Sequence, residues 1–193
     1  MDNSTPRTDP RILRTRQLLR DAFIELLQEM DIEKISVNRL AKRATINRVT
    51  FYLHYRDIPD MLEKMANDMI EDIHQVLDNT PLPSNSAEEE DWPMLVNLLE
   101  HISKHAKFYK VILAINRTTI FSDRLLKLLA KLVTERLGEN DSFLVKASIQ
   151  KDIAIWYGSS ALIGTIIAWL RNDMPYTPLF LAKQFSLLRS ISR

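Results

Sequence analysis

Cysteine is absent from the 193-residue sequence, and glycine occurs only three times. Without cysteine, the chain has neither a disulfide framework nor a cysteine zinc site. The sequence also lacks a glycine-rich phosphate loop, a nucleophile elbow and a paired-carboxylate motif. We therefore expect a protein that is not an enzyme and that carries no metal and no cofactor.

Long hydrophobic runs are also scarce, and one stretch needs an explanation. Ile153–Leu170 contains 18 residues without a charge, which reaches the lower edge of a membrane span. Within it, Ser160, Gly164 and Ala168 recur every four residues, and so form a smooth helical stripe on which another helix can pack closely. We expect this stripe to lie in a dimer interface rather than in lipid.

The N-terminal residues have no apolar run behind their charges, so we expect no secretory signal and a cytoplasmic protein.

Charge of one sign is missing from part of the chain. Lys and Arg number 26 against 25 acids overall, but residues 1–56 carry 11 against 7. Residues 36–56 contain five Lys and Arg and no acid at all. A basic end on a slightly acidic body predicts a polyanionic partner for that end.

Helical periodicity dominates the sequence, and no strand-like alternation or internal repeat occurs. Ser36, Asn47 and Asp57 are suitable N-caps for helices in the first half of the chain, as are Asp91 and Ser122 in the second. The fold class predicted is all-α, with about nine helices at 10–30, 36–44, 47–53, 57–78, 92–105, 108–115, 122–137, 143–172 and 178–190.

The predicted organisation is an N-terminal arm at 1–9, a three-helix domain at 10–56, and a second helical domain at 57–193. The segment NTPLPSNSAEEED has two prolines, small polar residues and an acid run, and so reads as a linker within the second domain.

The two short helices at 36–44 and 47–53 are separated only by Thr45 and Ile46, which is helix-turn-helix spacing. In such a motif the second helix enters the major groove, and acids there would face phosphates. The alternative is that these two helices do not bind DNA, because amphipathic helices with some arginines occur in any helical protein.

The order of residues in ISVNRLAKRATINRVTFYLHYRDIPDML resembles the DNA-binding domain of the TetR (tetracycline repressor-like) family. The matching positions are Ile35, Ser36, Val37, Leu40, Ala41, Ala44, Ile46, Thr50, Phe51, Tyr52, His54 and Tyr55. The resemblance is specific over about residues 10–70. Three positions depart from the family pattern: Thr45 replaces a glycine, Val49 a small residue and Ile58 a lysine.

The resemblance implies a DNA-binding transcriptional regulator whose C-terminal domain dimerises and often binds an effector. Among the candidate DNA contacts, Arg48 is the best base reader, because a guanidinium matches the two acceptors of guanine. Val49 suits a thymine methyl, and we expect Arg56 to stand in for the lysine missing at Ile58. The other candidates are Ser36, Asn38, Thr50, Tyr52 and His54, mostly for phosphates, while Lys42 and Arg43 add positive field and Arg7 and Arg11 lie in the arm.

The expected function is a repressor that binds a palindromic operator as a homodimer and is released by a small effector. The candidate effector residues are Met65, Met69, His101, Trp156 and Tyr157, each of which can equally be a core residue. His101 and His105 have the i, i+4 spacing of metal ligands but no clear third partner. The alternative function is an adaptor or coactivator of the same fold that binds a protein and no small molecule.

Overall fold

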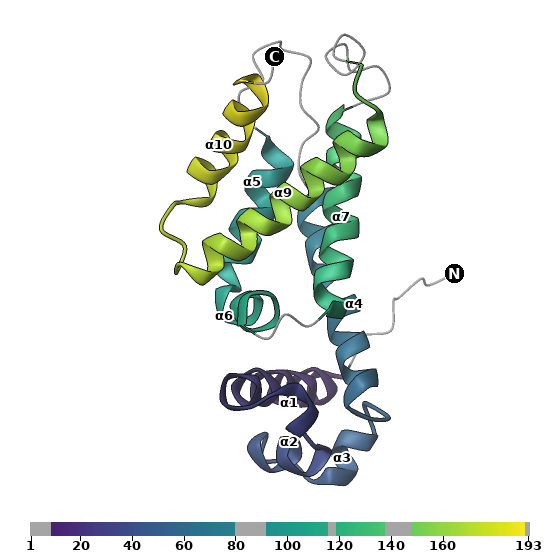
Figure 1. Ribbon diagram of the computed structural model, residues 1–193. Coiled ribbons are helices and arrows are strands. Elements are labelled where there is room, and N and C mark those ends of the chain that lie inside the picture. The colour runs from purple at the N-terminus through teal and green to yellow at the C-terminus, as the bar shows by residue number, and fades with distance from the viewer. Residues whose placement is uncertain (1–8, 80–91, 116–118, 138–147, 192–193) are drawn as a thin grey trace, which may run out of the picture. The chain divides into compact units, whose positions relative to one another are not determined.

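The computed structural model describes residues 9–79, 92–115, 119–137 and 148–191. Over these ranges the chain forms nine α-helices and no strand, which confirms the all-α prediction (Figure 1). The chain divides into two compact units, one ending at Met65 and the other beginning at Ala66. This division falls within a helix, α4 (Ile58–Asp78), at whose start the sequence had placed the domain boundary.

The first unit contains α1 (Pro10–Glu29), the short 3-10 turn η1 (Ile32–Lys34), α2 (Val37–Arg43), α3 (Arg48–Tyr52) and the start of α4. α1 begins where the Asp9 carboxylate accepts a hydrogen bond from the Arg11 amide at 2.9 Å, with Pro10 at the first helical position. Arg11 therefore belongs to the helix rather than to the N-terminal arm, and Arg7 lies outside the described residues. The core consists of fully buried apolar side chains: Leu19, Phe23, Leu40, Phe51 and Met61.

The second unit contains the rest of α4, α5 (Pro93–Lys104), α6 (Ala106–Tyr109), the π-helical turn η2 (Lys110–Ile115), α7 (Thr119–Leu137), α9 (Lys151–Arg171) and α10 (Pro178–Ile191). α9 packs obliquely against α7 and also against η2, while α10 packs against α5 (Figure 1). These helices enclose a core of aliphatic side chains that includes Leu98, Ile112, Leu129 and Ile166.

Three predicted features of the second unit differ in the structure. α7 begins at Thr119, so Ser122 lies in its first turn instead of capping it. α9 begins at Lys151 and not at 143, because Ser148 has a left-handed φ of 53° and Gln150 an extended backbone. The predicted helix at 108–115 divides into α6 and a π-helical turn. The Asp91 cap and residues 80–91 of the predicted linker lie outside the described residues.

α9 is long and apolar enough to cross a membrane, since its most apolar 18-residue window has a mean hydropathy of 1.6. One such helix is weak evidence for a membrane span, because the core helix of a soluble protein meets the same criterion. Only 28% of that window is buried within a single copy. Large apolar side chains on α9 and α10 therefore face solvent, and we call this surface the α9–α10 face. Its exposed residues include Ile153, Trp156, Tyr157, Leu179, Phe180, Leu187 and Leu188.

Candidate nucleic-acid interface

Two N-caps and one C-cap set the geometry of α2 and α3. The Ser36 hydroxyl accepts from the Arg39 amide at 3.4 Å, and the Asn47 side chain accepts from the Val49 amide at 2.8 Å. Between them, the amides of Thr45 and Ile46 donate to the carbonyls of Lys42 and Ala41, at 3.2 and 3.0 Å. This is the Schellman pattern, in which the first residue after the helix cap adopts a left-handed conformation. Thr45 does so, with a φ of 57°.

The turn presents one side of α3 to solvent. Phe51 is fully buried, whereas Val49 is 66% exposed and Tyr52 is 46% exposed. Arg48, at the first position of the helix, is exposed as well. The exposed end of α3 therefore offers a guanidinium and an apolar methyl pair side by side, which are groups suited to guanine and to thymine.

Arg48 is held in place by Tyr52, one helical turn away. Its Nη2 and Nε atoms donate to the Tyr52 hydroxyl at 3.0 and 3.3 Å, and the guanidinium carbon lies 5.3 Å from the centre of the Tyr52 ring. These contacts restrict the rotamers of Arg48, so less side-chain entropy remains to be lost on binding. The sequence had assigned Tyr52 to a phosphate only, and the structure shows that it also supports the predicted base reader.

A carboxylate organises the segment between α3 and α4. Asp60 is 9% exposed and accepts from the Arg56 amide and the Lys64 ammonium, both at 3.0 Å. It also accepts from the Arg56 guanidinium, whose Nη2 lies 3.0 Å away. The bond from the Arg56 amide, followed by that from Lys64, lowers the pKa of Asp60 to about 2. The side chain of Arg56 nevertheless remains 85% exposed, so it is both anchored and accessible.

His54 stands beside this carboxylate network and is partly buried. Burial, and then the nearby charges of Arg16 and Lys64, lower the pKa of its imidazole. A neutral imidazole still donates one hydrogen bond, so His54 is suited to bind a phosphate as a donor and not as a charge. Ser36 and Asn38 are exposed on α2 and its cap, and Thr50 is half-buried on α3.

Arg43 has a different role from the one predicted. It donates to both oxygens of Glu29, at 2.8 and 2.7 Å, and to Glu25 at 3.4 Å, so it ties α2 to α1. These bonds raise the pKa of Arg43 and lower that of Glu29. Sequence reasoning missed this contact, although Glu25 and Glu29 share one face of α1 at i, i+4 spacing, which was the available signal.

The candidate effector residues lie in different environments. Met65 and Met69 are buried, whereas Trp156 and Tyr157 are 63% and 78% exposed. His101 is half-buried with its ring centre 4.8 Å from that of His105, and burial lowers its pKa. Within the described residues no group of three potential ligands is placed to hold a metal ion.

Comparison with known proteins shows which family this chain resembles. Residues 90–190 match the TetR-type family described as "Transcriptional regulator C-terminal region". The chain is 24% identical over 178 residues to the "Uncharacterized HTH-type transcriptional regulator YxbF" of Bacillus subtilis (strain 168). That match covers 92% of this chain and 45% of the relative, so the chain spans about half the length of the curated protein that it matches.

Solved structures show the same fold. A TetR transcriptional regulator from Streptococcus agalactiae 2603V superimposes with a TM-score of 0.66 and 26% identity, over 93% of this chain and 96% of that one. The regulator FadR from Bacillus subtilis, solved in complex with stearoyl-CoA, gives a TM-score of 0.56 and 18% identity, over 89% and 96%. The match over residues 90–190 covers more than half of the sequence, and the first unit carries a helix-turn-helix, so this chain belongs to the TetR family of DNA-binding transcriptional regulators.

Proposed function

We propose that this chain represses transcription by binding a palindromic operator as a homodimer, and that a small effector releases it. The observation that carries the proposal is the exposed start of α3, where Arg48 and Val49 face solvent beside Tyr52. In this arrangement Arg48 reads a guanine and Val49 contacts a thymine methyl.

Phosphate contacts fix the position of the reading helix on DNA. Hydrogen-bond donors to the phosphates come from Ser36, Thr50, Tyr52 and His54, and Arg56 supplies a positive charge. The absence of acids from residues 36–56 supports this assignment, because a carboxylate on this surface would repel the backbone. Asn38 is exposed on α2 and is assigned to either a base or a phosphate.

The α9–α10 face supports the homodimer. A surface with this many exposed apolar side chains marks an interaction site, and two helices from each subunit would form a four-helix bundle. Ser160, Gly164 and Ala168 are all exposed along α9, where a second copy would reach them. Covered in this way, α9 belongs to a soluble cytoplasmic dimer and not to a membrane.

Four of the five candidate effector residues lie in the second unit, and Met65 lies in the first. The FadR relative is a complex with stearoyl-CoA, so proteins of this fold do accept small molecules. Met69 and His101, together with Trp156 and Tyr157, remain the candidate contacts. We propose no enzymatic activity.

One observation favours the alternative function of a non-enzymatic adaptor. Trp156 and Tyr157 are exposed on the surface rather than enclosed, and exposed aromatic residues are enriched at protein–protein interfaces. A metabolite screen by thermal shift, run with and without operator DNA, separates the two functions. An effector that releases DNA must itself bind more weakly when operator is present, whereas an adaptor shows no such ligand.

Gel-shift titration with genomic fragments tests the DNA contacts. Arg48→Ala is expected to relax preference at one base position at a cost of about 1–3 kcal/mol, while Tyr52→Phe weakens binding to all sequences. Because Tyr52 also holds Arg48, the double variant should lose less than the sum of the two, with a coupling of about 0.5 kcal/mol or more. Equal affinity of the wild type for all fragments would refute sequence-specific binding.

A further inference from the structure

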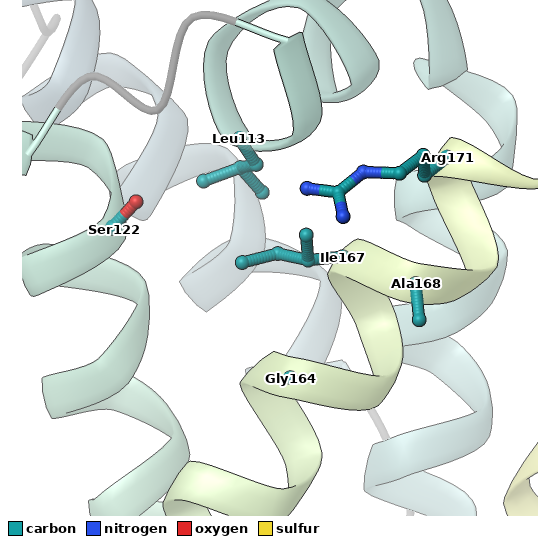
Figure 2. A pocket seen from close by; sticks show the side chains of 6 residues that line it. All are labelled: Leu113, Ser122, Gly164, Ile167, Ala168 and Arg171. Carbon is teal, nitrogen blue, oxygen red and sulfur yellow. The ribbon is translucent and has the colours of Figure 1, made fainter.

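A hollow lies on the second unit between η2, the first turn of α7 and the second half of α9 (Figure 2). Its volume is about 330 Å³, at the lower end of the range of about 300–1,000 Å³ typical of small-molecule sites. It is lined by Leu113, Ser122, Gly164, Ile167, Ala168 and Arg171. The hollow is therefore mainly apolar, with a single hydroxyl and a single cation.

Figure 2 shows the Arg171 guanidinium extending toward the hollow on the side opposite Ser122, with Leu113 and Ile167 between them. Gly164 contributes open space, because a Cβ built there meets no other atom within 4 Å. A small molecule entering the hollow would therefore meet aliphatic walls on its way to a single positive charge.

The charge of Arg171 is not balanced by an acid in the described part of the chain. Its one hydrogen bond there is a long one of 3.4 Å from Nη2 to the Ala114 carbonyl. The nearest acid along the chain, Asp173, is paired with Lys110. A guanidinium has five N–H donors, so Arg171 keeps donors for a ligand.

We propose that this hollow binds a small organic carboxylate, with its apolar body against Leu113 and Ile167 and its carboxylate on Arg171. One guanidinium offers two parallel N–H donors, which match the two oxygens of a carboxylate. A phosphate, with more oxygens and a larger charge, is matched less well, because the lining adds to Arg171 only the Ser122 hydroxyl on the opposite side. This inference rests on the proposed function, since it names the chemical class of the effector and places it in this hollow, which none of the effector residues expected from the sequence lines.

The rival occupant is a side chain from a second copy, because Gly164 and Ala168 also belong to the proposed dimer interface. To pair with Arg171, that copy would need an acid on α9 or α10. Those two helices contain one acid, Asp152. It lies in the first turn of α9, at the opposite end of the helix from Arg171, and is the one acid of these two helices that a second copy could bring to Arg171. Asp152→Asn therefore separates this occupant from a free anion in the experiment below.

The experiment measures binding to the full-length protein without DNA by isothermal titration calorimetry. The probes are hexanoate and phenylacetate, each compared with its uncharged amide, hexanamide and phenylacetamide. We expect the carboxylates to bind about 10- to 100-fold more tightly than the amides, and Arg171→Gln to abolish that difference. Arg171→Lys keeps the charge but loses the fork, so it should retain only part of the preference.

Two control variants complete the design. Lys151→Gln removes a cation at the other end of α9, and Asp152→Asn removes the acid that a second copy would use; neither should change probe affinity. Equal affinity for acids and amides, no binding of any probe, or unchanged affinity in Arg171→Gln would each overturn the proposal. If Arg171→Gln and Asp152→Asn instead weaken the dimer alike in sedimentation, the second copy fills the hollow and the proposal is wrong. Operator binding by the wild type is measured separately, so loss of the repressor function would not be confused with loss of this site.

Discussion

Thr45 holds a backbone conformation that disfavours its own side chain. Its φ of 57° is required by the Schellman bonds that end α2, yet a β-branched residue in the left-handed region is strained. The family pattern has glycine at this position, which reaches the same conformation without a Cβ clash. The strain lies in the turn that orients the reading helix, so it bears on both stability and DNA binding.

Thr45→Gly is expected to stabilise the protein by about 1 kcal/mol, because relief of the left-handed strain outweighs the extra freedom of glycine in the unfolded chain. Urea unfolding followed by circular dichroism measures this difference. Thr45→Ala is the matched control, since it keeps the Cβ and should gain much less. A glycine variant no more stable than the alanine variant would show that the turn is not strained.

Asp60 concentrates several interactions in one carboxylate, and its pKa of about 2 lies below the ordinary value of 3.8. A depressed pKa means that the folded state favours the ionised form. The resulting stability is present above about pH 4 and is lost as the pH falls toward 2.

Asp60→Asn is therefore expected to lower the thermal midpoint at pH 7, with a gap to the wild type that is constant above about pH 5 and shrinks below about pH 4. Thermal scans between pH 7 and pH 3 follow this gap. Asp68→Asn, which removes an exposed carboxylate from the same helix, serves as the control. A gap as large at pH 3 as at pH 7 would mean that ionisation of Asp60 contributes nothing.

Among the helices, α9 contains two glycines, and they lie in different environments. A Cβ at Gly158 would lie 3.2 Å from Val133 Cγ1 on α7, so this glycine permits the close packing of two helices within one subunit. Gly164 faces open space in a single copy. The first glycine therefore belongs to the fold, and the second is available to a partner or a ligand.

Gly158→Leu is expected to destabilise the folded subunit by about 1–3 kcal/mol through overpacking against α7. Gly164→Leu should leave the helical content unchanged and convert the proposed dimer into a folded monomer. Circular dichroism with sedimentation velocity distinguishes these effects. Persistence of a dimer in Gly164→Leu would remove the Ser160, Gly164 and Ala168 stripe from the interface.

For the whole molecule, operator binding by a homodimer doubles every contact made by one subunit. Each phosphate neutralised by a cation releases counterions, so the logarithm of affinity falls linearly with the logarithm of salt concentration. Arg56 is exposed and fixed by Asp60, which makes it a suitable probe of this relation.

Arg56→Gln is expected to reduce the slope of that salt dependence by about 2 per dimer, which is about 1 for each lost phosphate contact. Fluorescence anisotropy with a labelled operator at several salt concentrations measures the slope. Lys127→Gln on α7 is the control and should leave the slope unchanged. A change of about 1 would indicate that one subunit alone contacts DNA.

Most of the helix-turn-helix was predictable because its determinants are local. Ser36 and Asn47 cap the helices that follow them, Asp57 accepts from the Asp60 amide at 2.7 Å, and a tight turn joins α2 to α3. Caps and spacing act over three or four residues, so they can be read from the order of the residues alone. The start of α9 was predicted too early, because the apolar pattern does not reveal the left-handed backbone of Ser148 and the extended backbone of Gln150.

The sequence by itself determined the all-α class, the family resemblance, and the places along α2 and α3 of the side chains proposed to contact DNA. Only the tertiary structure decided that Arg43 pairs with acids of α1, that Tyr52 holds Arg48, and that Arg171 extends toward a hollow. The tertiary structure also decided which side of α9 is exposed, because that helix is apolar on every side and its periodicity does not reveal which side is covered. Packing between segments far apart in the chain settles such questions, since each side chain's environment there depends on helices that its own neighbours in sequence do not specify.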